Sequence, residues 1–262
     1  MPDSSGRNRD IWILELARGV LSRFTFDSGN DFLPIWSPDG SRIAFGSDRG
    51  GGASSLYQKP SDGSGAEELL FKSTTENAAP YNWSPDGRFI IHRYMANGFF
   101  NSGVLPLTSD RKPQLYQQVS FTQTLRDVSA DGRWVVYQSN ESGRFEVFVQ
   151  TFPTPGGKWQ VSNSGGIHPR WRDDGKEIFY YAADGQLMAV PIGAGDKALQ
   201  IGAPAPLFKA RMLLGPITAV GFNQQYDVTQ DGRRFLLNVP VEDTPVSPIT
   251  IVLNWTTGLG GR

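Results

Sequence analysis

Cysteine and histidine, two residue types that often carry catalysis or bind metal ions, are scarce in this sequence of 262 residues. It has no cysteine and only two histidines, His92 and His168. Thiolate nucleophiles, disulfides and cysteine-based zinc or iron–sulfur sites are therefore excluded. No Gly-x-Ser-x-Gly segment is present to hold a serine nucleophile on a sharp turn. The sequence therefore predicts no catalytic residue, no metal site and no cofactor.

Five aspartates are spaced regularly enough to suggest acid–base or metal chemistry. Each precedes a glycine, and together they are Asp39, Asp86, Asp131, Asp174 and Asp231. An Asp-Gly pair is also what a tight turn needs, because aspartate caps the turn through its side chain and glycine adopts a positive φ. If each turn belongs to a separate repeat, the five carboxylates are spread apart and cannot share one ion. We therefore assign them a structural role.

The turns belong to a repeated unit, which steps along the chain by 47, 45, 43 and 57 residues. The anchors of the repeats are residues 36–45, 83–92, 128–137, 171–180 and 228–237. The second copy illustrates the plan, because its apolar and turn residues alternate as four short strands would. It predicts a strand ending at Trp83, a turn at Ser84–Gly87, a strand at Arg88–Arg93, a loop at Met95–Gly103, and strands at Val104–Leu107 and near Gln114–Val119.

A period in the forties with four strands per repeat is typical of β-propeller blades. We expect an all-β fold, a β-propeller of four-stranded antiparallel blades, as one domain over residues 1–262 with residues 1–9 flexible. Asp10–Leu16 and Leu21–Phe26 read as an extra N-terminal hairpin, and Pro248–Trp255 reads as a third strand of the last copy. The hairpin either completes the fifth blade or is half of a sixth, so five and six blades both stay open. The missing half-blade suggests a piece of a longer protein.

Two apparent functional positions read better as packing positions. Trp36, Trp83 and Trp171 occupy a repeat position that is valine in the other copies, which indicates an apolar slot between blades. His92 occupies a slot that is aromatic or leucine elsewhere, so we expect a packed histidine. His168 precedes Pro169 at the start of a strand that should line the central channel, where it either titrates near neutral pH or is a solvated loop residue.

Recognition loops are expected on one rim of the propeller. Loops that join the second and third strands share this rim with loops that join successive blades, and such loops carry binding residues. The adjacent pair Phe99-Phe100 is the best candidate for an apolar anchor. Arg49 and Arg144 have the alternative role of bracing their own turns. The candidate contact residues are Arg49, Arg93, Phe99, Phe100, Asn140, Glu141, Arg144, His168 and Arg170.

Charge and hydropathy limit the partners. The 25 basic and 26 acidic residues give a net charge of −1 without any block of like charge, so no nucleic-acid partner is predicted. No apolar run reaches the length of a membrane span, and this segment is not expected to insert into a membrane. The polar first ten residues contain no signal peptide.

The repeats also resemble known families. The pattern within Leu33–Gly51, Pro-x-Trp-Ser-Pro-Asp-Gly followed by Ile-Ala-Phe, resembles the WD-like repeat of TolB-type β-propellers. Tyr137–Arg144, Gly156–Val161, Pro169–Ile178 and Ile249–Leu259 are similar to the C-terminal propeller of bacterial membrane-anchored Ser/Thr protein kinases. That resemblance implies a sensor module located in the periplasm or elsewhere outside the cytoplasm, with the cytoplasm as the alternative. The kinase motifs themselves are missing from this sequence.

Together these features predict a non-catalytic module for protein, peptide or ligand recognition within a larger signalling protein. The partner would be a protein or peptide, or a cell-envelope ligand. One alternative is a propeller enzyme of the glycan lyase or hydrolase type, with His168, Arg170 and Tyr226 at the channel mouth. A purely structural role is the other.

Overall fold

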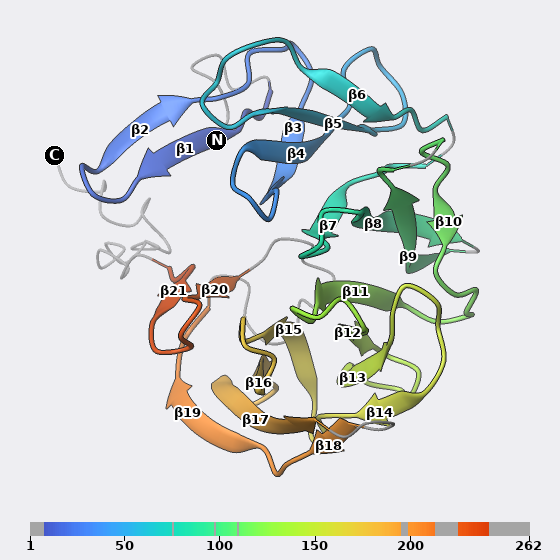
Figure 1. The fold of residues 1–262 in the computed structure, drawn as a ribbon, viewed down its shortest axis with the longest axis vertical. Coiled ribbons are helices and arrows are strands. Elements are labelled where there is room, and N and C mark those ends of the chain that lie inside the picture. Colours follow the sequence, from blue (N-terminus) through green and yellow to red (C-terminus); the bar gives the residue numbers. More distant parts are fainter. Residues whose placement is uncertain are drawn as a thin grey trace, which may run out of the picture.

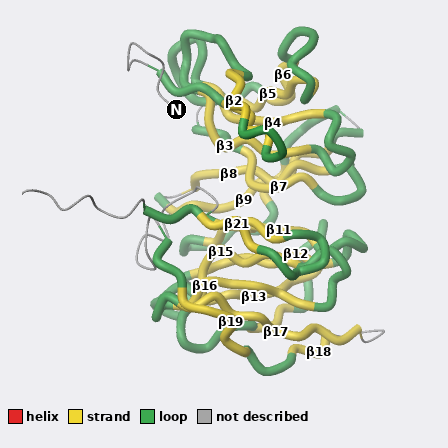
Figure 2. Tube along the Cα trace, turned by 90° about the vertical axis from the view of Figure 1, so that its left-hand side faces the viewer, coloured by secondary structure: helices red, strands yellow, loops and turns green. Residues whose placement is uncertain are grey.

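The computed structural model shows β-strands arranged as sheets in a ring (Figure 1). It describes residues 8–240 apart from 75, 97, 109, 195–198 and 213–224. The described residues contain strands, turns and loops but no helix (Figure 2). No helix in this described part is therefore long and apolar enough to cross a membrane. The predicted all-β propeller of four-stranded antiparallel sheets is confirmed.

Three consecutive sheets each contain four strands in chain order. The first has β3 (Asp31–Trp36), β4 (Arg42–Ser47), β5 (Ser55–Pro60) and β6 (Glu68–Phe71); the second has β7 (Pro80–Trp83), β8 (Phe89–Ala96), β9 (Phe99–Pro106) and β10 (Gln114–Leu115); the third has β11 (Gln123–Val128), β12 (Trp134–Ser139), β13 (Glu146–Thr151) and β14 (Lys158–Gln160). All neighbouring pairs are antiparallel. Each sheet therefore corresponds to one repeat of the sequence.

The fourth repeat forms a larger sheet. β15 (Gly166–Trp171), β16 (Glu177–Ala182) and β17 (Gln186–Ala194) follow the common plan. The long β17 pairs along one part with β19 (Ala205–Lys209) and along another with β18 (Leu199–Ile201). The sequence pattern had not indicated β18, which is only three residues long.

Two hairpins lie on either side of the remaining part of the ring. β1 (Trp12–Glu15) pairs with β2 (Val20–Arg23), and β20 (Tyr226–Val228) pairs with β21 (Phe235–Leu237). Among the described strands, neither hairpin is hydrogen-bonded to the other. The predicted strand Pro248–Trp255 and most of the insertion near Arg211–Gly221 lie outside the described residues. The number of blades therefore stays a prediction.

Each repeat's Asp-Gly turn has the predicted local structure. In the first turn, Gly40 N–H donates to Ser37 O at 2.9 Å, and Gly40 has a φ of +69°. Asp39 accepts hydrogen bonds from the Ser37 hydroxyl and from Ser41 N–H. These hydrogen bonds lower the pKa of Asp39 to about 2. The aspartates of the other four turns accept hydrogen bonds within their own turns in the same way. Their role is therefore structural.

The loop predicted at Met95–Gly103 is wrong. β8 continues to Ala96 and β9 begins at Phe99, and these two residues are paired. Gly98 lies between them and has a φ of +81°. Asn-Gly between two strands is the preferred sequence of a two-residue hairpin, so the signal was present. Phe99 and Phe100 are consequently half-buried strand residues and do not lie in a polar loop.

The chain is described from Asn8 onwards, so the flexibility predicted for residues 1–9 stays a prediction. Asn8 and Arg9 form hydrogen bonds with the segment before and at the start of β3. The Asn8 side-chain amide donates to Asp27 O at 2.8 Å, and Asp31 N–H donates to Arg9 O at 2.7 Å. The chain therefore enters β1 along the first sheet.

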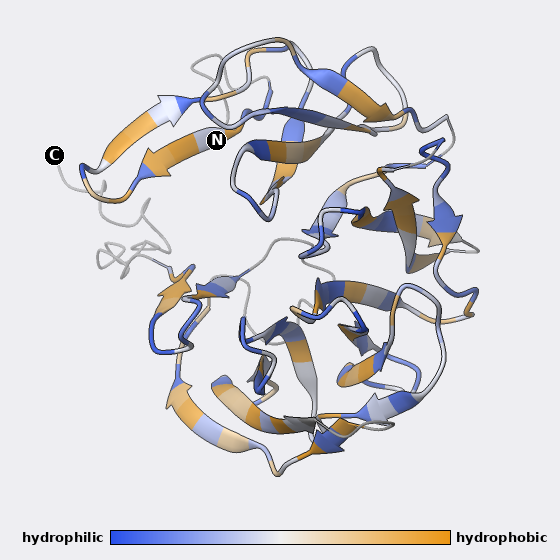
Figure 3. Cartoon of the chain, viewed as in Figure 1, coloured by the Kyte–Doolittle hydropathy of each residue, from blue (hydrophilic) through white to orange (hydrophobic). Residues whose placement is uncertain are grey.

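The apolar core lies between neighbouring sheets. The repeat position occupied by tryptophan or valine contributes to it: Val128 packs with Tyr81 and Ile91 of the preceding repeat, and Trp171 packs with Trp134 and Val136. Trp36 differs, because 54% of it is exposed. β1 and β2 are also largely hydrophobic (Figure 3), although Leu14 in β1 and Leu21 in β2 are 51% and 44% exposed. The packing slot is therefore filled in the second to fourth repeats and open in the first.

Candidate binding site at the centre of the ring

A β-bulge recurs in the first strand of four repeats. Pairing with the second strand shifts between Phe32 and Ile35, Pro80 and Asn82, Leu125 and Asp127, and Ile167 and Arg170. A bulge leaves its residues outside the ladder and re-aims their side chains. The bulged residues are Leu33-Pro34, Tyr81, Arg126 and His168-Pro169. Leu33 and His168 both have a φ of +52°, which bulky residues rarely adopt.

Bulged residues from three successive repeats line one cavity. Its volume is about 570 Å³, and Leu33, Pro34, Tyr81 and Arg126 all contribute to its wall. The N-terminal hairpin supplies further lining through Trp12 and Leu21. This volume lies within the range of small-ligand sites, which are mostly apolar with a few placed polar groups. The repeat architecture thus brings together residues that are up to 93 positions apart in the sequence, from Leu33 to Arg126.

Two residues of the cavity lining, Arg126 and Trp12, carry buried N–H groups. Arg126 is only 3% exposed, and its guanidinium carbon lies 5.0 Å from the centre of the Tyr81 ring, a cation–π arrangement. Burial lowers the pKa of Arg126 and raises the pKa of Tyr81 to about 12. The indole Nε1 of Trp12 is buried and has no hydrogen-bond partner among the described residues.

The cavity lining also includes two carboxylates, each of which forms an ion pair with an arginine. Asp10 lies 2.8 Å from the guanidinium of Arg23, and Asp31 lies 3.1 Å from that of Arg49. Both carboxylates line the cavity and are fully buried. Burial raises the pKa of Asp31, and the hydrogen bonds from neighbouring side chains and the charge of Arg49 oppose that rise.

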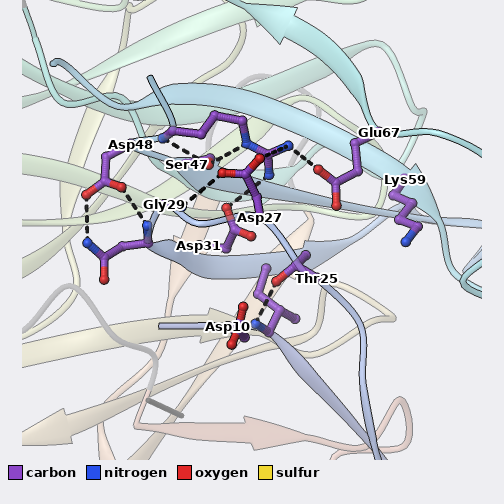
Figure 4. Close-up of polar contacts among 12 residues, drawn as sticks. Asp10, Thr25, Asp27, Gly29, Asp31, Ser47, Asp48, Lys59 and Glu67 are labelled. Atoms are coloured by element: carbon purple, nitrogen blue, oxygen red, sulfur yellow. Dashed lines mark hydrogen bonds and ion pairs between the residues drawn. The ribbon is translucent and has the colours of Figure 1, made fainter. Parts of the chain in front are cut away.

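Arg49 is the centre of a polar cluster behind this wall. Asp27, Asp31 and Glu67 gather around its guanidinium (Figure 4). The Arg49 side chain is 16% exposed and also lies over the Tyr57 ring at 4.2 Å. These contacts agree with the alternative role predicted for Arg49, which is to stabilise its own turn, because the acidic residues that pair with it belong to the first sheet or directly precede it.

His168 lies inside β15 and is 1% exposed, so it is neither a solvated loop residue nor an open titrating group. Its backbone N–H donates to the Gln138 side chain at 2.8 Å, while both ring nitrogens are buried without a hydrogen-bond partner among the described residues. Burial, and secondarily the charge of Arg126, lower the pKa of His168 to about 3. The imidazole is therefore neutral at pH 7.

Arg170 takes part in a chain of polar contacts between repeats. Asn82, Asp127, Arg170 and Asp227 all directly precede the tryptophan or valine position of their repeats. The Asn82 amide donates to Asp127 at 2.9 Å, and Arg170 lies 3.8 Å from Asp127 and 2.7 Å from Asp227. These contacts tie four sheets together around the centre of the ring.

The remaining predicted contact residues lie away from the cavity lining. Arg93 Nε donates to Asn77 O, Asn140 accepts from Thr122 N–H, and Glu141 pairs with Lys158. Arg144 pairs with the buried Glu146 but remains 62% exposed. Arg93, Phe99 and Phe100 belong to the second four-stranded sheet, whereas Asn140, Glu141 and Arg144 lie in the loop between β12 and β13 of the third.

Sequence reasoning missed the cavity residues Asp10, Trp12, Asp31, Tyr81 and Arg126. A signal existed for two of them, because Tyr81 and Arg126 stand two residues before the tryptophan or valine position, where other repeats carry Pro34, Pro169 and Tyr226. A buried arginine at a position shared with proline and tyrosine is unusual. No group of three metal-ligating side chains occurs within the described ranges.

The chain matches the family model described as the TolB beta propeller domain over residues 3–124. It is 37% identical over 87 residues to the uncharacterized peptidase YuxL of Bacillus subtilis, covering 31% of this chain and 12% of YuxL. It is 26% identical over 174 residues to the uncharacterized protein Atu1656 of Agrobacterium fabrum, covering 66% of this chain and 51% of the relative. The chain thus spans about half or less of the length of these curated relatives.

Solved structures agree with the sheet arrangement. TolB from Acinetobacter baumannii aligns with a TM-score of 0.59 at 17% identity, over 78% of this chain and 49% of that one. A putative TolB from Agrobacterium tumefaciens gives 0.59 at 20% identity, over 75% and 73%. A puromycin-hydrolyzing peptidase from Mycobacterium tuberculosis gives 0.52 at 14%, over 77% and 42%. At these identities the likeness shows the fold; the similarity to kinase-associated propellers stays a prediction.

Proposed function

We propose that this chain, a TolB-like β-propeller, is a non-catalytic recognition module that binds a peptide segment of a protein partner in the cavity at the centre of the ring. One observation carries the proposal: bulges at equivalent positions of three repeats converge on a cavity of about 570 Å³. The cavity combines an apolar wall with a buried cation and a buried N–H donor. A peptide offers both apolar side chains and acceptor groups, so it suits this lining.

The chemistry of the cavity favours binding over catalysis. Neither histidine lines it, and both are held neutral by burial. The two carboxylates of its wall are paired with arginines. General acid–base catalysis needs groups that are free to exchange a proton with a substrate, whereas these carboxylates are engaged in ion pairs and the histidines lie outside the cavity lining.

The proposal extends to the setting of the module. We treat residues 1–262 as one propeller domain that serves as the sensor of a larger signalling protein, outside the cytoplasm. The partner is a protein or a peptide. A ligand from the cell envelope is the alternative. The match to TolB propellers supports the recognition role, and the kinase-like segments of the sequence motivate the signalling role.

A catalytic role is the second candidate, because two similar proteins carry the word peptidase in their names. Among the described residues, His168, Arg170 and Tyr226 are buried or engaged in contacts between sheets, which does not favour them as an active site. Hydrolysis of a peptide by this chain, abolished in an Arg126→Gln variant, would replace the recognition proposal.

Selection of peptide ligands tests the proposed function. A random peptide library would be selected on the immobilised chain, and the affinity of selected peptides measured by calorimetry. Leu21 is 44% exposed and lines the cavity, so Leu21→Trp should narrow it without disturbing the core. We expect at least tenfold weaker binding for Leu21→Trp and unchanged binding for Trp36→Ala, which lines a different pocket. Failure to select any peptide with a folded chain, or equal binding by both variants, would overturn the proposal.

A further inference from the structure

We infer that a second pocket of the ring binds a proline-rich peptide segment that carries a basic residue. The pocket has a volume of about 310 Å³ and lies where the first strands of four repeats end in their Asp-Gly turns. We call it the turn pocket. None of its lining residues lines the central cavity, so this inference does not depend on the proposed function.

Two equivalent positions of four repeats form most of the turn pocket. The first is the tryptophan or valine position, which contributes Trp36, Trp83, Val128 and Trp171. The second stands two residues later, directly before the aspartate of the turn, and contributes Pro38, Pro85, Ala130 and Asp173. All four residues at the second position are exposed. The repeats therefore bring tryptophan and proline rings from separate sheets to one pocket.

Trp36 offers the turn pocket an indole that is already open to a ligand. It is 54% exposed, whereas Trp83 is half-buried and Trp171 is 4% exposed. Proline-rich segments dock in grooves lined by aromatic side chains. Such segments hold the polyproline II conformation before they bind, so they lose little conformational entropy on docking. The exposed indole beside two prolines of the lining is a surface of this kind.

Hydrogen bonding in the turn pocket also favours a proline-rich segment. The Nε1 of Trp171 is buried and has no hydrogen-bond partner among the described residues. Asp127, a possible acceptor in the lining, already accepts from the Asn82 amide and from Trp171 N–H, each at 2.9 Å. A polyproline II segment has free carbonyl acceptors, and its prolines have no N–H to satisfy. Glycan hydroxyls donate as well as accept, so they match this pocket less well.

Asp173 determines the charge of the preferred peptide. Its side chain is exposed and forms no ion pair with any described residue, because the adjacent Arg172 pairs with Asp174 and Glu177 instead. The equivalent position is uncharged in the other three repeats that line the pocket. A lysine or arginine next to the prolines would therefore meet a complementary charge in the fourth repeat.

A neighbouring pocket favours an extended ligand over a compact one. Ala130 and Trp171 also line this pocket, which has a volume of about 420 Å³, so it adjoins the turn pocket. Its apolar lining comes from the third and fourth sheets and includes Trp134, Ile192 and Leu199. A peptide that leaves the turn pocket beside Trp171 thus meets further apolar surface.

The test compares three synthetic peptides, each acetylated and amidated at its ends. The first has five prolines followed by arginine, the second has five prolines followed by glutamate, and the third has alternating glycine and serine followed by arginine. Binding to the whole chain would be measured by tryptophan fluorescence and calorimetry at pH 7. We expect the proline–arginine peptide to bind at least tenfold more tightly than the glycine–serine peptide. It should bind about two- to fivefold more tightly than the proline–glutamate peptide, as expected for an exposed ion pair.

Four variants assign the binding to the turn pocket. Trp36→Ala changes an exposed side chain and should weaken the proline–arginine peptide at least tenfold. Trp171→Phe removes the indole N–H and should weaken it several-fold, and Asp173→Asn should abolish the preference for arginine over glutamate. Leu21→Trp, which changes the central cavity, should leave its affinity unchanged.

Equal binding of the proline and glycine–serine peptides, or equal affinity of the native chain and Trp36→Ala, would overturn the inference. Binding of chitotriose that is lost in Trp36→Ala, without binding of the proline peptides, would overturn it in favour of a glycan. The proposed function is judged separately, by library peptides that respond to Leu21→Trp and not to Trp36→Ala. Either site can therefore fail while the other stands.

Discussion

The guanidinium of Arg170 lies 2.7 Å from the carboxylate of Asp227, a residue that occupies the same position one repeat later. The same guanidinium lies 3.8 Å from Asp127, one repeat earlier. One side chain therefore connects three sheets across the centre of the ring. The charge of the two aspartates raises the pKa of Arg170 above its ordinary value, although burial opposes it. The position before the tryptophan or valine of each repeat thus works as a link between blades.

Arg170→Met should destabilise the fold by about 2–3 kcal/mol, because it leaves the largely buried Asp127 without its nearest cation. Asp227→Asn removes a partner that is 59% exposed and should cost less than about 1 kcal/mol. Urea unfolding followed by tryptophan fluorescence would measure both. Equal losses would mean that Arg170 does not act through Asp127.

Two tryptophans at the same repeat position should respond differently to truncation. Trp171 is 4% exposed within a cluster that includes Trp134 and Ile178, whereas Trp36 is 54% exposed. We expect Trp171→Ala to cost about 3–5 kcal/mol through the cavity that it leaves. Trp36→Ala should cost less than about 1 kcal/mol. Thermal unfolding of both variants would give the comparison, and a large loss for Trp36→Ala would show that its slot is filled.

The fold could be predicted from the sequence because the same pattern of turn and strand residues occurs in five repeats. The Asp-Gly turns marked where the first strand ends and the second begins, and Asp39 and Asp86 bond as turn residues should. Strand ends that depend on hairpin chemistry were less certain. β8 and β9 extend to Ala96 and Phe99 on either side of Gly98, where the sequence pattern predicts a loop.

The candidate site was much harder to predict, because its residues are positioned by bulges. Alternation along a strand assigns each residue to one face, but a bulge adds a residue and re-aims the side chains beside it. Arg126 and Tyr81 meet for this reason, although they are 45 residues apart. Predicted rim residues such as Arg49 are instead engaged in ion pairs, so charge reversal there would damage the fold as well as any binding surface.

The contact between His92 and Gly103 should make that glycine irreplaceable. The two residues are paired between β8 and β9, and a Cβ atom on Gly103 would lie 2.4 Å from His92 Nε2. We expect Gly103→Ala to cost about 1–3 kcal/mol. Combining it with His92→Ala should cost clearly less than the sum of the two single changes. A double-mutant cycle by chemical denaturation measures this coupling, and additive losses would contradict the contact.

Arg49→Met should produce a pH-dependent loss of stability. Arg49 opposes the rise in the pKa of the buried Asp31, so its removal raises that pKa further above the unfolded value. A carboxyl group with a raised folded pKa destabilises the fold where it is ionised, and the cost disappears as the pH falls through the folded pKa. We expect a greater difference from the native chain at pH 7 than at pH 4. A difference independent of pH would mean that Asp31 is not the group affected.

The two buried histidines should make the chain acid-sensitive. Burial lowers the pKa of His92 to about 4 and that of His168 to about 3, whereas both are near 6.5 in the unfolded chain. Between these values the unfolded chain binds protons that the folded chain does not, so the free energy of unfolding should fall as the pH drops from about 6.5 towards 4. His92→Phe places an aromatic ring in a slot that is Phe45 and Tyr137 in other repeats. Between pH 6 and pH 4.5, the unfolded and folded forms of this variant should differ by about one bound proton less than those of the native chain, so its unfolding free energy should depend less steeply on pH. An unchanged slope of unfolding free energy against pH would mean that His92 is protonated in the folded chain over this range.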